Sequence, residues 1–410
     1  MKRLAYIRNG WLPTKQANGV QVVRMCEAFT RIGLDTFLSY IRSPFLSQDV
    51  YTYYDIRQPI RLKPLPRAVL PLRKNFSPEQ WLDLPGFGHA FLWSFVSVML
   101  AKRLRADLYF TRDSTVAWWL GRLRLPTVCE VHTMPDSLIA CSFLRGAASY
   151  ESVKLVLAIT EYLRRDLIKK VRVPEKKTLT LHDAVDIERF PLSPSREEAR
   201  QHLGLPLDKR LVVYTGQLSL EKGIDTLVQA ASVLHNVLVV LVGGLTEDIR
   251  NVRHLAAQVG ATNIILVGYI LPGNVPLYLE AADILVLPHS MQSYHVAYYT
   301  SPLKLFQYMA SHRPIVASDL PSQREVLRHG ENAWLVEPDD PRALARGLQI
   351  VLENPHLQNL LSHNAYITAT ENFTYEERVG KILGFVEDCS MGELITKTHP
   401  SYAAIEDQTE

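Results

Sequence analysis

The chain contains 410 residues, of which 47% are hydrophobic and 21% charged, and 45 Lys and Arg against 42 Asp and Glu give a formal net charge of +3. This composition predicts a soluble globular protein of two or three domains, each large enough to form a hydrophobic core. The small net charge gives no indication of a nucleic-acid partner. The four cysteines form no Cys-x-x-Cys pair, which argues against a disulfide scaffold or a zinc site and favours a reducing cytoplasm.

No segment is predicted to cross a membrane. The N-terminal MKRLAYIRNG has the alternation of a strand and not the composition of a signal peptide. The apolar segment 91–104 is shorter than the roughly 18 residues of a membrane span, and a strand-like segment follows it at once. We therefore predict a helix at 91–104 that covers a sheet.

Short β-branched runs alternate with helical patterns such as 20–32 and 226–234. The predicted strands are 4–8, 108–111, 127–131, 155–159, 211–215, 237–242, 264–267, 284–287 and 315–317. Most are apolar on both faces, which is typical of strands buried in parallel sheets. The alternation predicts right-handed βαβ units in two Rossmann-like doubly wound domains of the α/β class, facing one another across a cleft.

Two segments interrupt this alternation. Residues 43–88 are rich in Pro and aromatic residues and predict an irregular insertion in the first domain. Its basic residues, with no acidic residue between the first and the last, are Arg57, Arg61, Lys63, Arg67, Arg73 and Lys74. The insertion is either a solvated excursion packed by its own side chains or a basic surface for an anionic acceptor or membrane headgroups. The second segment, 187–209, combines prolines with charges and predicts a linker between domains.

The predicted organisation is therefore a first domain at 1–190 and a second at 191–372. A helix at 373–390 is expected to cross back to the first domain, so that the two halves hinge about a shared strap. Residues 391–410 lose the helical pattern and predict a mobile tail.

The common nucleotide-binding fingerprints are absent. The sequence contains no Gly-x-Gly-x-x-Gly after a strand and no Gly-x-x-x-x-Gly-Lys-Ser/Thr, which disfavours a nicotinamide oxidoreductase and a P-loop enzyme. It also lacks Asp-x-Asp, the paired carboxylates that hold a diphosphate through a divalent metal. A bound diphosphate would have to be neutralised by donors of the protein itself.

Two segments could supply such donors. After the strand ending at 215, a loop carries Gly216, Gln217, Lys222 and Gly223 and leads into a helix, which outlines an anion site but is also common in surface loops.

In the second segment, Ser301 is a predicted N-cap and Pro302 a predicted first helical residue. The amides of Leu303 and Lys304 would then point into the cleft, and Gln307 would lie on the same side one turn later.

These motifs resemble the retaining GT-B glycosyltransferases of family 4. The similar segments are TGQLSLEKGIDTL, AADILVLPHS, TSPLKLFQYMASHRPIVASDLPSQREVL and ENAWLVEPDDPRALA, in an agreement that runs from about 182 to 351. The first half agrees more loosely, through PTKQANGVQVVRMCEAF, TVCEVHTMPD and LHDAVDIERF. Asn18 and Gly19 stand at the family's glycine-rich turn near donor and acceptor, and His132 at its cleft histidine.

The resemblance implies roles for individual residues. Lys222 would bind the diphosphate and His132 would approach the transferred sugar, both as catalytic residues. The donor-binding set would comprise Gly216, Gln217, Tyr269, Ser301, Leu303, Lys304 and Gln307. Within it, Gln307 would bond the ribose and Tyr269 would border the base, although simple packing also explains Tyr269. His132 alone could equally be a buried structural histidine, with Glu130 as the partner that orients its ring.

The implied reaction is metal-independent, cofactor-free transfer of a hexose from a UDP- or GDP-sugar, with retention, to the hydroxyl of a sugar or lipid-linked acceptor. The first domain would lie on the acceptor side and the second would bind the nucleotide sugar. The expected setting is polysaccharide or glycolipid synthesis in the cytoplasm, with peripheral attachment to the anionic inner membrane face. The family often has Arg at position 217 and Glu at positions 299 and 307, where this chain has Gln217, Tyr299 and Gln307. A catalytically weakened sugar-nucleotide-binding or scaffold protein is therefore the alternative.

Overall fold

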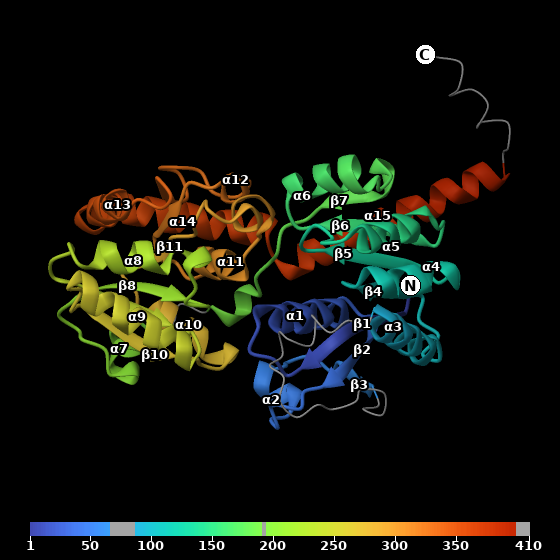
Figure 1. Cartoon of the computed structure of the whole chain (residues 1–410), viewed down its shortest axis with the longest axis horizontal. Helices are drawn as coiled ribbons and strands as arrows, with labels where there is room; N and C mark the ends of the chain where they lie inside the picture. The colour runs from blue at the N-terminus through green and yellow to red at the C-terminus, as the bar shows by residue number, and fades with distance from the viewer. Residues whose placement is uncertain (66–86, 191–193, 399–410) are drawn as a thin grey trace, which may run out of the picture.

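The computed structural model describes residues 1–65, 87–190 and 194–398. The chain forms two domains, each built on a sheet whose paired strands all run parallel. The N-terminal sheet has the order β3-β2-β1-β4-β5-β6-β7, and the C-terminal sheet has the order β10-β9-β8-β11-β12-β13. In Figure 1 the C-terminal domain lies on the left and the N-terminal domain on the right. The predicted pair of doubly wound α/β domains is confirmed.

The N-terminal sheet consists of β1 (Arg3–Leu12), β2 (Asp35–Arg42), β3 (Arg61–Leu65), β4 (Leu108–Thr111), β5 (Thr127–Val131), β6 (Val153–Ala158) and β7 (Thr178–Thr180). Its helices are α1 (Ala17–Arg31), α2 (Val50–Tyr54), α3 (Phe87–Lys102), α4 (Ser114–Arg122), α5 (Leu138–Ser149), α6 (Glu161–Asp166) and the C-terminal α15 (Tyr375–Thr398). Alternate residues of β1 lie on opposite faces of this sheet. Leu4 and Tyr6 join the core beneath α1 and α15, whereas Ala5 and Ile7 join the core beneath α3 and α4.

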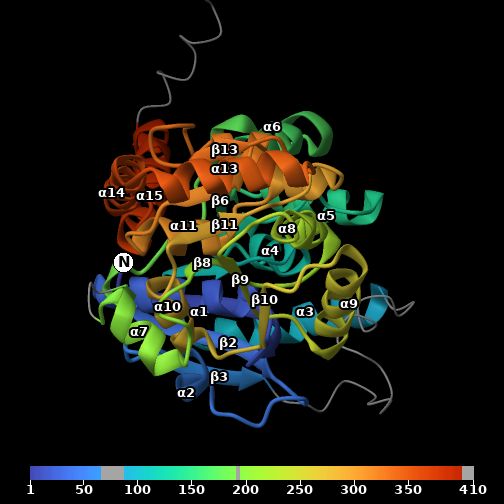
Figure 2. The ribbon, with the colours of Figure 1, turned by 90° about the vertical axis from the view of Figure 1, so that its left-hand side faces the viewer.

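The C-terminal sheet consists of β8 (Arg210–Thr215), β9 (Val237–Val242), β10 (Ile264–Gly268), β11 (Ile284–Leu287), β12 (Ile315–Ser318) and β13 (Trp334–Val336). Its helices are α7 (Arg196–Leu203), α8 (Ile224–Ala231), α9 (Thr246–Val259), α10 (Val275–Glu280), α11 (Leu303–Ala310), α12 (Pro321–Arg324), α13 (Pro341–Glu353) and α14 (Pro355–Asn372). Figure 2 shows this domain from its outer side, with α7, α10, α11 and α14 to the left of the strands and α8 and α9 to the right. The two groups of helices cover separate cores on the two sheet faces.

Two predicted irregular segments contain regular structure. The insertion 43–88 contributes α2 and the edge strand β3, so the prediction of a wholly irregular excursion is wrong for these residues. The strand was missed because an edge strand tolerates charges, and β3 reads RLKPL. The predicted linker 187–209 contains α7, which begins at a capping box of Ser195 and Glu198 and packs Ala199 into the core of the C-terminal domain.

The basic residues of the insertion are partly neutralised where the structure describes them. Arg61 pairs with Asp35 at 2.7 Å and also lies over the ring of Phe37. Arg57 pairs with Asp55 at 3.3 Å. Lys63 lies over the ring of Phe37, with Nζ 5.9 Å from its centre. Arg67, Arg73 and Lys74 lie outside the described residues.

Helix α15 lies with the N-terminal domain although it follows the C-terminal domain in sequence (Figure 1). Val379, Ile382 and Val386 are buried in the core that α1 also covers. Helix α15 continues to Thr398, so the prediction that helical structure ends before residue 391 is wrong for residues 391–398. The described helices include none that is long and apolar enough to cross a membrane. Helix α3 instead covers the N-terminal sheet, with Trp93 and Val98 buried.

Candidate active site

Residues that follow strands of both sheets meet at the boundary between the domains. The N–H of Asp183 donates to Oγ of Ser301 at 2.9 Å, and Oγ1 of Thr160 donates to the carbonyl of Tyr298 at 3.0 Å. The hydroxyl groups of Tyr53 and Tyr269 also share a hydrogen bond across this boundary. Ligands of parallel α/β domains bind where strands end, so this boundary is the candidate site.

Close backbone packing shapes the loop after β8. Gly216 has a φ of +129°, and a Cβ atom there would lie 2.4 Å from Nζ of Lys304. Gly223 has a φ of +66°, and a Cβ atom there would lie 1.7 Å from the carbonyl oxygen of Pro288. These positions need glycine for both conformation and space. The loop that carries Lys222 is therefore held against the end of β11.

Two lysines converge on this loop from different elements. Lys304, in the first turn of α11, donates from Nζ to the hydroxyl of Tyr214 at 2.6 Å and lies 3.9 Å from the centre of its ring. The Tyr214 hydroxyl donates in turn to the carbonyl of Gln217 at 2.7 Å. Neither Lys222 nor Lys304 forms an ion pair within the described part of the chain.

The electrostatics of this region favour an anion. Burial, and then the charge of Lys222, lowers the pKa of Lys304 well below the usual lysine value. Burial also lowers the pKa of Lys222, which the nearby Glu221 opposes. The adjacent His289 is buried, its pKa is lowered by burial and then by both lysines, and its Nε2 has no hydrogen-bond partner among the described residues. A bound anion would relieve the mutual repulsion of these groups.

The start of α11 differs from its prediction in one detail. The N-cap is Pro302, not Ser301, and no side chain caps the helix. Ser301 is buried and uses its hydroxyl as the acceptor for the Asp183 amide. The N–H groups of Leu303 and Lys304 donate to no residue in the described ranges, so the helix start retains free donors beside the Lys304 side chain.

The other predicted donor residues have distinct environments. Gln217 is exposed, and Gln307 is partly exposed one turn after the start of α11. Tyr269, besides its contact with Tyr53, lies beneath Nζ of Lys15 at 5.1 Å. Tyr269 therefore contacts the N-terminal domain. The sequence predicted only that Tyr269 borders the base, and it did not predict this contact.

On the N-terminal side, His132 and Glu130 form the contact that the sequence suggested. Nε2 of His132 bonds Oε1 of Glu130, and Nη2 of Arg378 from α15 lies 3.2 Å from Oε2 of Glu130. Burial opposes ionisation of Glu130, but Arg378, His132 and Arg112 together keep its pKa below the usual range. Burial and then Arg112 lower the pKa of His132 to about 4, although Glu130 acts in the opposite direction.

These shifts define the state of the histidine at neutral pH. His132 is neutral while Glu130 is ionised, so Nε2 must carry the proton that bonds the carboxylate. Nδ1 is then a hydrogen-bond acceptor, which suits the hydroxyl group of a sugar.

The glycine-rich turn of the first domain is also tightly packed. A Cβ atom on Gly19 would lie 2.3 Å from the hydroxyl of Tyr54. The carbonyl oxygen of the Asn18 side chain accepts a hydrogen bond from Nη2 of Arg8 at 2.9 Å. The structure places Asn18 and Gly19 in the first turn of α1, where they hold the start of the helix against Arg8 and Tyr54.

Comparisons with known proteins agree with this architecture. The family description "Glycosyl transferases group 1" matches residues 195–368, and "Glycosyltransferase Family 4" matches residues 49–189. The chain belongs to the group 1 glycosyltransferases. The expected family and transferase class are therefore confirmed.

Individual relatives of this glycosyltransferase are distant. A D-inositol 3-phosphate glycosyltransferase of Xylanimonas cellulosilytica is 28% identical over 334 residues, which cover 73% of this chain and 76% of that protein. An uncharacterized glycosyltransferase of Methanocaldococcus jannaschii is 22% identical over 270 residues, covering 62% of this chain and 67% of that protein.

Solved structures share the GT-B fold. The crystal structure of Anabaena HepE in complex with UDP and glucose has a TM-score of 0.71 at 17% identity, over 94% of this chain and 100% of that chain. A glycosyltransferase from Rickettsia africae has a TM-score of 0.74 at 14% identity, over 95% of this chain and 98% of that chain.

One group of described side chains in the glycosyltransferase has the spacing of a metal site. Ligand atoms of Glu130, His132 and Asp183 lie within 4.8 Å of one another. The cations Arg378 and Arg112 already serve Glu130, and burial raises the pKa of Asp183 to about 7. A carboxylate that is shared with two arginines, and a carboxyl group that is largely protonated below pH 7, are poor ligands for a divalent ion.

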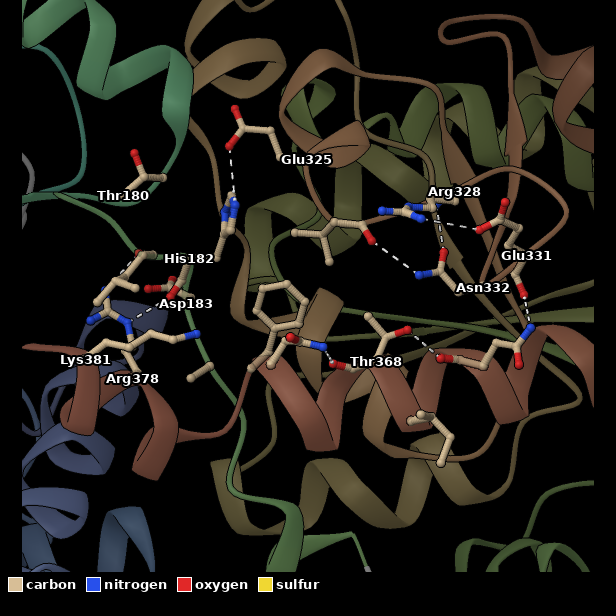
Figure 3. Close-up of a pocket in the computed structure, with 17 residues that line it drawn as sticks. Thr180, His182, Asp183, Glu325, Arg328, Glu331, Asn332, Thr368, Arg378 and Lys381 are labelled. Carbon is tan, nitrogen blue, oxygen red and sulfur yellow. Dashed lines mark hydrogen bonds and ion pairs between the residues drawn. The ribbon is translucent and has the colours of Figure 1, made fainter.

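A cavity of about 570 Å³ is lined by residues 180–184 and by residues of α14 and α15 (Figure 3). Two of its lining residues, His182 and Glu325, are in contact, with Nε2 and Oε2 3.3 Å apart, and Arg378 and Lys381 of α15 line another part. None of the lysines described on the donor side lines this cavity. It lies between residues 180–184, α14 and α15, and it adjoins the candidate site through Asp183 and Arg378.

Sequence reasoning missed three residues of the glycosyltransferase site. Tyr214 is the last buried aromatic of β8, and nothing local distinguishes it from a core residue. His289 follows a predicted strand within AADILVLPHS, so the rule that ligands bind where strands end could have identified it. Arg378 comes from α15 and reaches Glu130 only through the tertiary fold.

Proposed function

We propose that this glycosyltransferase moves a hexose from a nucleotide diphosphate sugar to an acceptor hydroxyl group, with retention and without a divalent metal, in polysaccharide or glycolipid synthesis. The observation that carries the proposal is the pair formed by Lys222 and Lys304. Both are desolvated and lack a carboxylate partner in the described chain, beside a helix start with free amides. Such a site is complementary to a diphosphate.

The two lysines would act mainly when the glycosidic bond breaks. Negative charge grows on the departing phosphate at that stage, and preorganised cations stabilise it more than they stabilise the bound donor. Lys304 is fixed by Tyr214, and the backbone that carries Lys222 is held close to the carbonyl of Pro288 at Gly223. The amides of Leu303 and Lys304 and the positive end of α11 add fixed donors.

Gln307 and Tyr269 would hold the nucleoside. Gln307 offers an amide to the ribose hydroxyls, a contact that involves no change of charge during the reaction. Tyr269, whose hydroxyl group bonds that of Tyr53 across the domain boundary, would border the base. UDP is the first nucleotide to test, because the similar Anabaena HepE was crystallised with UDP and glucose.

His132 would orient the transferred hexose. Its Nδ1 is the free acceptor, so it would receive a hydrogen bond from a sugar hydroxyl while Glu130 holds the ring. A histidine whose pKa is about 4 is a weak base near pH 7, so we assign it positioning of the sugar and not proton transfer.

The proposal also includes reversible attachment to an anionic membrane surface. The basic residues of the insertion support it, at roughly 1 kcal/mol for each residue that reaches the surface. We expect co-sedimentation with anionic liposomes at low salt that weakens at high salt. Replacing Arg61, Lys63 and Arg67 by Ser should reduce it while activity on a soluble acceptor persists. No co-sedimentation of the parent protein would refute the attachment.

The central experiment is a donor screen. The full chain is incubated with UDP-, GDP- and ADP-hexoses, with acceptors present and EDTA added, and nucleotide release and product anomeric configuration are measured. Release with one donor and a product of retained configuration supports the proposal. Tight donor binding with no release across a broad acceptor panel would instead indicate the binding or scaffold protein.

A further inference from the structure

Two arginines stand side by side at the carboxyl edge of the N-terminal sheet. Ile7 of β1 pairs with Thr111 of β4, so Arg8 and Arg112 are the next residues on two neighbouring parallel strands. By the alternation of β1, Arg8 lies on the same sheet face as Tyr6, the face that α1 covers. The proximity of Arg112, after burial, contributes to lowering the pKa of Arg8 to about 10.

The two guanidinium groups are incompletely satisfied. Arg8 donates to the side chain and backbone carbonyls of Asn18, but its buried Nε has no partner in the described chain. Nη1 of Arg112 is likewise buried and unpartnered, and its Nε lies 3.8 Å from Glu130. Buried donors of arginine are rarely left without acceptors in a native protein.

The neighbouring groups do not provide the missing negative charge. Glu130 is already shared by Arg378 and His132. Burial raises the pKa of the Tyr6 and Tyr54 hydroxyl groups, so both are neutral at physiological pH. Asp183 lies within 4.8 Å of the ligand atoms of Glu130 and His132, and burial raises its pKa to about 7, so it is only partly ionised near neutral pH. Arg112 therefore shares the carboxylate of Glu130 with Arg378, and Arg8 has no carboxylate partner among the described residues.

The site remains accessible to a ligand. The side chains of Arg112 and His132 are 20% and 21% exposed, so solvent and a ligand can reach this edge of the sheet. It lies on the domain opposite Lys222 and Lys304, which the proposed function assigns to the donor diphosphate. His132 at the same edge would orient the hexose of the donor, so an anion bound here is carried either by the acceptor or by that hexose, and the test below separates the two.

We propose that Arg8 and Arg112 bind an oxyanion, a carboxylate or phosphate, on the acceptor, so that the acceptor of this enzyme is an acidic sugar or a sugar phosphate. The inference rests on the proposed function, because it takes the donor to occupy the C-terminal side. Arginine forks match such oxyanions through paired, charge-assisted hydrogen bonds. Arg8 and Arg112 would thus select the acceptor by its charge and set its orientation toward His132.

The test uses the full chain saturated with UDP, which fills the diphosphate site. Glucose, glucuronate, glucose 6-phosphate and inorganic phosphate are titrated at constant ionic strength by calorimetry. We expect the anionic probes, but not glucose, to bind, and Arg8→Gln and Arg112→Gln to weaken that binding by about tenfold or more. Arg103→Gln, which removes an exposed arginine after α3, should bind as the parent does. Glucuronate binding alone would identify a sugar acid, and glucose 6-phosphate binding alone a phosphate.

The same variants carry their own folding control. UDP affinity and thermal unfolding should stay near the parent values, and Arg112→Lys should retain part of the anion binding because it keeps the charge. If glucose binds as well as the anions, or if the glutamine variants bind them unchanged, the inference is overturned. It is also overturned if Arg112→Gln selectively weakens UDP-glucuronate against UDP-glucose, since the oxyanion would then be on the donor. Failure of the parent to bind UDP, GDP and ADP alike would instead refute the proposed function.

Discussion

At the carboxyl edge of the N-terminal sheet, Glu130 is shared by Arg378, His132 and Arg112, whereas at the corresponding edge of the C-terminal sheet Lys222 and Lys304 have no described carboxylate partner. In the first arrangement the carboxylate of Glu130 holds α15 to the sheet through Arg378, and Arg8 and Arg112 lie beside it with unpartnered donors. The second lowers the pKa of both lysines and leaves positive charge to be balanced by a ligand. The same fold thus offers one edge suited to hold a sugar and one suited to hold a diphosphate.

The largest expected effect is on turnover at the C-terminal edge. Lys222→Ala should lower kcat by about 100- to 1,000-fold, the range for loss of one preorganised group that stabilises transition-state charge. Steady-state kinetics of nucleotide release measures it. Lys209→Ala, at an exposed lysine of the same domain, should leave kcat unchanged. A Lys222→Ala enzyme with parent kcat would show that the leaving group is stabilised elsewhere.

A substitution at the N-terminal edge should mainly lower the stability of the fold. Glu130→Gln leaves the buried Arg378 without its counter-ion and should lower the free energy of unfolding by about 3 kcal/mol. Denaturant unfolding at pH 7 measures this change. Glu161→Gln removes a more exposed ion pair with Arg164 and should have a much smaller effect. Equal effects of the two substitutions would contradict the picture of a buried network at Glu130.

Gln307→Ala should change donor binding by a smaller amount. The lost ribose contact is worth on the order of 1 kcal/mol, so KM for the donor should rise about fivefold while kcat changes little. The contrast with Lys222→Ala separates binding of the nucleoside from stabilisation of the leaving group. Equal losses of kcat in both variants would mean that the site is wrongly assigned.

The smallest expected effect is a pH dependence of the protein's stability that arises from Asp183. Burial raises the pKa of this carboxyl group to about 7 from its ordinary value near 4, so the folded state binds the extra proton between those values. This contribution to stability is present below pH 4 and is lost as pH rises through 7. Asp183→Asn should therefore raise the unfolding temperature by a few degrees more at pH 8 than at pH 5. A variant with an unchanged pH profile would show that Asp183 titrates normally.

Most of the sheet strands were predictable, and the reason is their uniform burial. Strands such as β4, β9 and β11 are almost wholly apolar and buried on both faces, a pattern typical of a sheet that helices cover on both sides. The short edge strands β7 and β13 were missed because three residues give too little pattern. Helix α7 was taken for a linker because charges and prolines surround its few core residues.

The donor side was easier to predict than the acceptor side. Lys222 and Lys304 belong to continuous segments in which a loop, a helix start and a charge occur together. The contact of Arg378 with Glu130 joins residues from opposite ends of the chain, and the pairing of Arg8 with Arg112 depends on strand register. Neither relation is encoded in local spacing, so only the folded structure reveals them.

In the proposed mechanism, lysines and helix amides, and not a metal ion, stabilise the departing nucleotide. The most direct test is the rate of nucleotide release from the preferred donor, measured with a saturating acceptor in EDTA and again with added Mg²⁺ or Mn²⁺. We expect equal rates in the two conditions. Loss of release in EDTA that either metal restores would contradict the claim.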